Sequence, residues 1–183
     1  MLTVMLGGAP GVGKTTVAGR LLELAHDGPR LVQWVDVDAL WLHQPWRVDE
    51  RMRTMVQANL RAVAGNASQA QVDILLITWV FQSAEIHRLV TGLLPAGTTT
   101  VSVQLRADHD TWIRRFEADP MRPGVNDFYQ GRYAAAQGTP VDHVVETDGL
   151  TPMDVARQVA ALIGLAEQGE SVAHRPGPAR HRM

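Results

Sequence analysis

Cysteine is absent from this sequence of 183 residues, aromatic residues are few, and neither sign of charge is in large excess. Without cysteine the chain can form neither a disulfide framework nor a thiolate metal site. A formal net charge of −2 provides no broad basic field of the kind that nucleic acids or anionic membranes require. We therefore expect no nucleic-acid or membrane partner, and any anionic ligand must be held locally.

Long apolar runs are missing as well. No stretch approaches the roughly 18 apolar residues that a membrane span needs. The opening MLTVMLGG has no basic region before its apolar residues, so it does not resemble a secretory signal. We expect a cytoplasmic protein, either a monomer or a homodimer.

What the sequence does contain is the composition of one globular domain. Hydrophobic residues make up 45% and charged residues 20% of a chain that is too short for two domains of ordinary size. We expect a folded domain over residues 1–166. The remaining residues, 167–183, lose all apolar periodicity, and we expect a disordered C-terminal tail there, to which we assign no function.

Short apolar runs alternate with segments of helical periodicity, a pattern typical of βαβ units around a parallel sheet. The pattern predicts strands at Leu2–Leu6, Leu31–Val37, Val72–Thr78, Thr99–Leu105 and Val141–Thr147. It predicts helices at Lys14–His26, Val48–Ala64, Ser83–Leu93, Asp110–Ala118, Asp127–Gln137 and Pro152–Leu165. The expected fold is a three-layer α/β domain with a five-stranded parallel sheet and helices on both faces.

A complete phosphate-binding motif, G-x-x-x-x-G-K-[ST], separates the first predicted strand from the first predicted helix. Its glycines permit positive φ, so that backbone N–H groups can point at an anion, and the positive end of the helix dipole faces the same point. The motif predicts that Lys14 bridges the β- and γ-phosphates and that Thr15 binds magnesium. The expected nucleotide-binding residues are Gly8, Ala9, Pro10, Gly11, Val12, Gly13, Lys14, Thr15 and Thr16.

Two carboxylates, Asp36 and Asp38, follow the second predicted strand, at the edge of a parallel sheet where ligands bind. If this stretch is extended, both side chains lie on one face and point into the same cleft. The alternative is that the two residues only cap the next segment, because aspartate is common at such junctions.

With these motifs the sequence resembles the small-molecule kinases of the P-loop proteins, the shikimate kinase, gluconate kinase and chloramphenicol phosphotransferase type. The resemblance implies strand order 2-3-1-4-5, ATP and Mg²⁺ as cofactors, Asp36 in the magnesium shell and Asp38 beside the acceptor hydroxyl, as orienter or general base. It also implies a lid in which Arg115 and Arg122 close over the phosphates, with Arg115 also contacting the nucleotide. The loop 147–152 is expected to lie beside the adenine.

One position departs from most P-loop proteins, which place an acidic residue at the end of the third strand. Here Thr78 stands at that position, and Asp73 lies at the opposite end of the strand. Kinases of the shikimate type lack this acid as well, so the departure favours the kinase branch. It also leaves open a nucleotide-binding switch or regulatory ATPase.

Three of the five tryptophans, Trp41, Trp46 and Trp79, follow the strands at the edge where a phosphoryl acceptor would bind. Rigid rings lining a cleft suit an apolar or ring-bearing ligand, although core packing is the ordinary role of tryptophan. The sequence therefore predicts an ATP-dependent kinase for a hydroxyl of a small molecule, such as an antibiotic or another ring-bearing metabolite. A nucleoside or nucleotide kinase remains an alternative.

Overall fold

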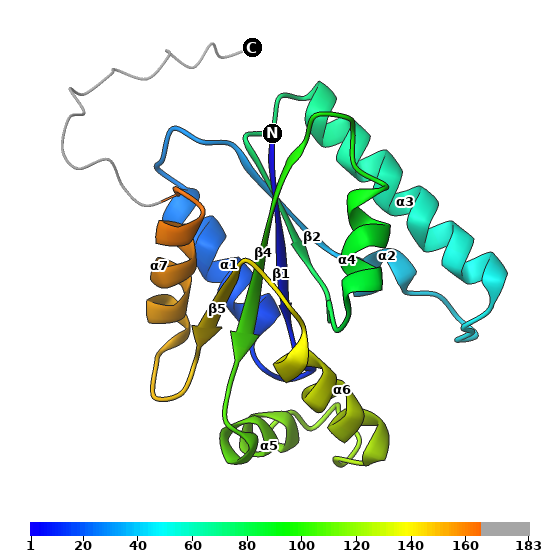
Figure 1. The fold of residues 1–183 in the computed structure, drawn as a ribbon, viewed down its shortest axis with the longest axis vertical. Coiled ribbons are helices and arrows are strands. Elements are labelled where there is room, and N and C mark those ends of the chain that lie inside the picture. Colours follow the sequence, from blue (N-terminus) through cyan, green and yellow to red (C-terminus); the bar gives the residue numbers. More distant parts are fainter. Residues whose placement is uncertain (166–183) are drawn as a thin grey trace, which may run out of the picture.

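A five-stranded parallel sheet forms the centre of the computed structural model, which describes residues 1–165 (Figure 1). The strands are β1 (Leu2–Gly8), β2 (Val32–Asp36), β3 (Ile74–Thr78), β4 (Thr99–Arg106) and β5 (His143–Glu146). Their order in the sheet is β2-β3-β1-β4-β5, and every neighbouring pair is parallel. The predicted fold class and strand order are confirmed. The tail predicted over 167–183 lies outside the described residues.

Seven helices accompany the sheet within residues 1–165. They are α1 (Lys14–Ala25), α2 (Val37–Trp41), α3 (Glu50–Gln69), α4 (Ala84–Thr91), α5 (His109–Glu117), α6 (Asp127–Gly138) and α7 (Pro152–Leu162). Figure 1 shows α1 and α7 on one side of the sheet and α3 and α4 on the other, with α5 and α6 beyond the carboxyl ends of β1 and β4. None of the helices in this part of the chain is both long and apolar enough to cross a bilayer.

The interior strand β3 explains why the sheet needs helices on both faces. All five of its residues are buried, and alternate side chains enter different cores. Ile74 and Leu76 pack with residues of α1 and α7, whereas Leu75 and Ile77 pack with residues of α3 and α4. A strand that is apolar on both faces is stable only when both faces are covered.

The segment after β2 differs from its prediction. The second predicted strand runs to Val37, but the strand ends at Asp36 and the short helix α2 follows at once. The reason is local, because the Asp36 carboxylate accepts a hydrogen bond from the Asp38 backbone N–H at 3.0 Å and so caps the new helix. Asp38 therefore lies in the first turn of a helix, and the prediction of a shared extended face is wrong.

Candidate active site

The glycines of the phosphate-binding motif adopt the conformations that its chemistry requires. Gly8, Gly11 and Gly13 have φ of 144°, 84° and 110°, a region that other residues rarely enter. At Gly11 an added Cβ would also lie 3.1 Å from the Phe116 ring. The loop is thus held in its shape by backbone freedom and by contact with α5.

The first helix is the only one of the seven described helices that begins without a side-chain cap. It starts after Gly13, with no acidic residue in its first turn. Each of the other six begins with a side chain that accepts a hydrogen bond from a backbone N–H; these caps are Asp36, Asp49, Ser83, Asp108, Asn126 and Thr151. The N–H groups at the start of α1 are therefore free to bind an anion in the loop.

Lys14 lies inside the loop that it is predicted to serve. Its Nζ donates hydrogen bonds to the carbonyl oxygens of Gly8 at 2.9 Å and Ala9 at 3.0 Å. Burial lowers the pKa of Lys14 to about 8, and attraction by Asp38 and Asp36 offsets only part of that effect. A phosphate group entering the loop would favour the charged form of this amine, which is the only lysine side chain in the sequence.

Asp36 divides its carboxylate between two tasks. One oxygen, Oδ1, caps α2, while Oδ2 lies 3.4 Å from the hydroxyl of Thr15. The capping alternative therefore describes the role of Oδ1. Through Oδ2, Asp36 lies next to Thr15, the other side chain that was predicted as a magnesium ligand.

Asp38 remains accessible from the cleft and lies close to Lys14 and Asp36, despite its helical setting. Partial loss of hydration, caused by the surrounding protein atoms, raises the pKa of its carboxyl above the ordinary range. The neighbouring negative charge of Asp36 raises this pKa further. Lys14 and a hydrogen bond from Trp79 oppose the shift. A carboxyl group with these neighbours can accept a proton more readily than a fully solvated aspartate.

Both predicted lid arginines lie beside the phosphate-binding loop. Arg115 and Arg122 line a cavity of about 200 Å³ together with Gly11, Lys14 and Thr15. The Arg122 guanidinium is held by Asp119 at 2.9 Å and lies 5.2 Å from the centre of the Phe116 ring.

Arg115 also reaches the predicted adenine side. Its guanidinium donates to the hydroxyl and the carbonyl oxygen of Thr147 at 2.7 and 2.8 Å. A second cavity of about 390 Å³ lies here, between the phosphate-binding loop and Thr147, Leu150 and Pro152. Gly11, Gly13, Thr16 and Arg115 line both this cavity and the one at the phosphate-binding loop. The loop 147–152 thus borders a space next to the phosphate site.

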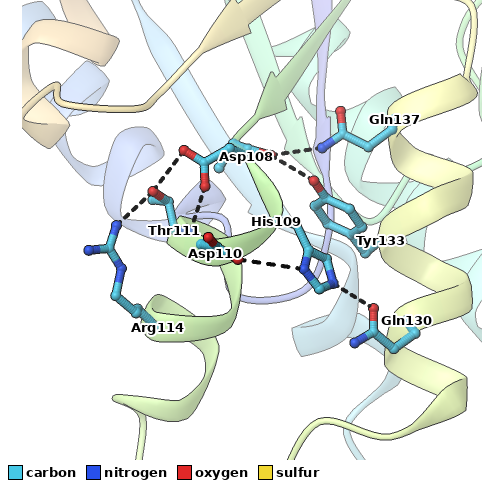
Figure 2. A network of polar contacts seen from close by, with 9 residues as sticks. Asp108, His109, Asp110, Thr111, Arg114, Gln130, Tyr133 and Gln137 are labelled. Carbon is cyan, nitrogen blue, oxygen red and sulfur yellow. Dashed lines mark hydrogen bonds and ion pairs between the residues drawn. The ribbon is translucent and has the colours of Figure 1, made fainter.

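A polar network joins the start of α5 to α6 (Figure 2). The Ala107 carbonyl accepts hydrogen bonds from Tyr133 at 3.1 Å and Gln137 at 2.9 Å, and His109 contacts Gln130. Trp112 of α5 stacks on the same Tyr133 and donates its indole N–H to the Pro10 carbonyl at 2.7 Å. The helices that flank the lid are therefore attached to the loop that would hold the phosphates.

A third cavity, of about 330 Å³, is lined by Val37, the residue that precedes Asp38. Two of the three tryptophans expected at an acceptor, Trp41 and Trp79, line it. Trp46 does not; it is 56% exposed and lies 6.2 Å from Trp41, ring centre to ring centre. The other two tryptophans of the sequence, Trp34 and Trp112, have structural contacts instead.

Arg132 is the residue that the sequence analysis missed. It projects from α6, lines the apolar cavity, donates to Gln82 at 2.8 Å and is near enough to influence the charges of Lys14 and Asp38. Nothing in its local sequence distinguishes it from a surface arginine. Only the packing of α6 against the end of the sheet brings it to the cleft.

The end of β3 lacks the acid found in most P-loop proteins, and the structure shows what Thr78 does there. Its side chain is fully buried and accepts a hydrogen bond from the Trp34 indole at 3.0 Å. Asp73, at the other end of β3, accepts from the Leu31 backbone N–H at 2.8 Å. Neither residue contributes a ligand to the cleft.

The oxygen atoms of Thr15 and Asp36 fit magnesium, which prefers a few hard oxygen ligands together with phosphates and water. No group of three or more His, Asp or Glu side chains in residues 1–165 could hold a metal ion without such help. The described residues therefore fit a metal that arrives with a nucleotide.

Comparison with known proteins points to the same fold. The model of a protein family described as "AAA domain" matches residues 4–132. No curated protein matches the sequence significantly.

Solved structures of small P-loop kinases and a resistance protein share the architecture. A tunicamycin resistance protein from Deinococcus radiodurans has a TM-score of 0.67 at 24% identity, over 90% of this chain and 96% of that one. A sugar kinase from a Janibacter species also has 0.67, at 15% identity, over 91% and 96%. An APS kinase from Mycobacterium tuberculosis, solved with AMPPNP and APS, has 0.59 at 22% identity, over 88% and 96%.

Proposed function

Because the chain belongs to the AAA domain family and has the fold of small P-loop kinases, we propose that it is an ATP-dependent phosphotransferase. Its substrate is the hydroxyl group of a small organic molecule. A ring-bearing metabolite, antibiotics included, is the acceptor class that the two tryptophans of the apolar cavity favour.

One observation carries this proposal: Asp38 lies near Lys14 of the phosphate-binding loop and directly follows a residue that lines an apolar cavity. Its charge couples to Lys14, and its neighbours Val37 and Trp79 line the cavity. A protein that only binds or hydrolyses nucleotide has no need of a second, apolar cavity at this position. A kinase needs one to hold the acceptor next to the terminal phosphate.

The residues of the cleft have distinct tasks in this reaction. Loop N–H groups and Lys14 hold the β- and γ-phosphates, and Arg115 and Arg122 neutralise charge on the group being transferred. The acceptor oxygen forms a bond to the γ-phosphorus, the bond from that phosphorus to the β,γ-bridging oxygen breaks, and the hydroxyl proton passes to Asp38. Magnesium, held by Thr15, Asp36 and the phosphates, would neutralise charge on the leaving ADP.

Lys14 provides a direct test of nucleotide binding, because a single lysine can be followed by mass spectrometry. ATP with magnesium should protect it from acetylation, with the N-terminal amine as an internal reference. Equal acetylation with and without saturating ATP would contradict the assigned phosphate site. A screen of hydroxylated metabolites and antibiotics for ATP-dependent gain of one phosphoryl group then tests the transfer.

The second candidate function is a nucleotide-dependent switch or regulatory ATPase, which the residue at position 78 leaves open. A threonine bound to Trp34 replaces the acid that most P-loop proteins use at this position. This function predicts slow ATP hydrolysis without any acceptor and a protein partner that binds one nucleotide state only. If the screen finds no phosphorylated compound and a pull-down depends on nucleotide, the switch replaces the kinase.

A further inference from the structure

All the residues that line the apolar cavity, and not only its two tryptophans, restrict which acceptor can bind there. Twelve residues from α2, α3, α4, α6 and the end of β3 line it, and nine of them are apolar. Val56, Leu60 and Val90 are the lining residues with the least exposed surface among those of α3 and α4. A cavity of about 330 Å³ is at the lower end of the range for small organic ligands.

Polar groups on a ligand would find few partners there. Apart from the indole N–H groups of Trp41 and Trp79, Gln57 supplies the only uncharged polar group among the twelve lining side chains. Burial of a hydroxyl group without a hydrogen-bond partner weakens binding. A polyhydroxylated sugar would bury several such groups against valine and leucine, so the cavity disfavours it.

The charges of the lining have a single sign. Arg53 and Arg132 are the only charged members, and the twelve described lining residues include no carboxylate. Arg53 is exposed on α3 and makes no side-chain hydrogen bond or ion pair with the described residues. Guanidinium groups repel a cation and attract a carboxylate.

The reactive end of the cavity is the end next to Asp38. Val37 precedes Asp38 in the chain, and Trp79, which lines the cavity, is a neighbour of the Asp38 carboxyl.

We propose that the acceptor is an apolar alcohol, neutral or acidic, and neither a polyhydroxylated sugar nor a cationic amino alcohol. Its apolar body fills the space between α3 and α4, and any acidic group lies toward Arg53. This inference rests on the proposed kinase function and specifies the substrate of the same site.

Binding without nucleotide tests the cavity separately from the reaction. The probes are phenethyl alcohol, its para-carboxylate, its para-aminomethyl derivative and glucose. Their binding is measured by quenching of tryptophan fluorescence and by calorimetry. We expect the neutral and carboxylate probes to bind, the cationic probe to bind at least about tenfold more weakly, and glucose not to bind. Tighter binding of glucose or of the cation would overturn the inference.

Matched variants locate the binding. Leu89 lines the cavity and Leu162 lies outside it on α7, and both are helical leucines that are 39% exposed. Leu89→Asp should weaken the neutral probe about tenfold, whereas Leu162→Asp should leave it unchanged. Arg53→Gln should remove any preference for the carboxylate probe, and Arg61→Gln, at another exposed position of α3, should not. Equal effects within either pair would place the probes elsewhere and overturn the inference.

Phosphorylation of the same probes separates the two proposals. ATP-dependent phosphorylation of glucose or of the cation, but not of the aryl alcohols, would overturn the acceptor class and leave the kinase function standing. If the aryl alcohols bind with the expected variant effects but no probe or screened compound gains a phosphoryl group, the kinase function fails, and the inferred acceptor class fails with it.

Discussion

In the phosphate-binding half of the cleft, nine consecutive residues, 8–16, supply the loop, the lysine and the free end of α1. In the acceptor half, side chains from five separate elements meet around an apolar cavity. The first half uses mostly backbone groups, whose chemistry is the same in any sequence that can adopt the loop. The second half uses side chains, so it can change its ligand without disturbing the first.

The largest expected effect separates the two halves completely. Lys14→Ala should weaken ATP·Mg binding by at least about a hundredfold, because two charge-assisted hydrogen bonds to phosphate are lost. Binding of phenethyl alcohol should not change. Calorimetry measures both, with Arg20→Ala on the exposed side of α1 as the control. Unchanged ATP affinity in the Lys14 variant would show that the triphosphate lies elsewhere.

The next effect is at the border between the halves. With an identified acceptor, Asp38→Asn should retain ATP binding and lose roughly a hundredfold or more in transfer rate, the scale of a positioned general base. Asp110→Asn, whose side chain is 96% exposed, is the matched control. An Asp38 variant that turns over at the wild-type rate would remove this residue from the mechanism.

Substitution of Asp36 should change the enzyme's kinetics in a different way from substitution of Asp38. Asp36→Asn should raise the magnesium concentration needed for half-maximal activity, because one of the two predicted protein ligands loses its charge. Rates measured across a magnesium titration distinguish the two variants. Identical titration curves for the Asp36 variant and the wild type would contradict the assigned role.

A pH titration should affect the phosphate half alone. The lowered pKa of Lys14, about 8, means that the free protein loses this charge above that pH. Phosphates favour the charged amine, so ATP binding takes up a proton, and affinity is full below about pH 8 and falls by about tenfold per pH unit above it. Calorimetry in two buffers of different ionisation enthalpy measures the proton uptake. Constant ATP affinity between about pH 7 and 9 would exclude proton uptake by Lys14 on ATP binding.

The smallest effect concerns the support of the loop. Trp112→Phe removes the N–H that binds the Pro10 carbonyl but keeps an aromatic ring, and should weaken ATP binding about three- to tenfold. Trp34→Phe is a matched control, because it removes the indole bond to Thr78 in the sheet. It should lower stability similarly without changing ATP affinity. Equal ATP affinity in the two variants would contradict a specific role for Trp112.

The fold was predictable because its signals are local and repeated. Apolar runs gave the strands, and the strand-loop-helix context of the motif gave the position of Lys14. The stretch after Asp36 was not predictable by the same rule, since one carboxylate turned an expected strand end into the helix α2. The pair of aspartates still meets Lys14, because the helix begins at the carboxyl edge of the sheet.

The sequence by itself therefore determined the parallel α/β fold and the phosphate-binding loop, because residues close together in the chain specify both. Only the tertiary structure decided that Arg132 joins Lys14 and Asp38, and that Trp41 and Trp79 share a cavity with α3 and α4 while Trp46 does not. These residues are distant in sequence. Their meeting depends on how the helices pack against the sheet, which no local pattern encodes.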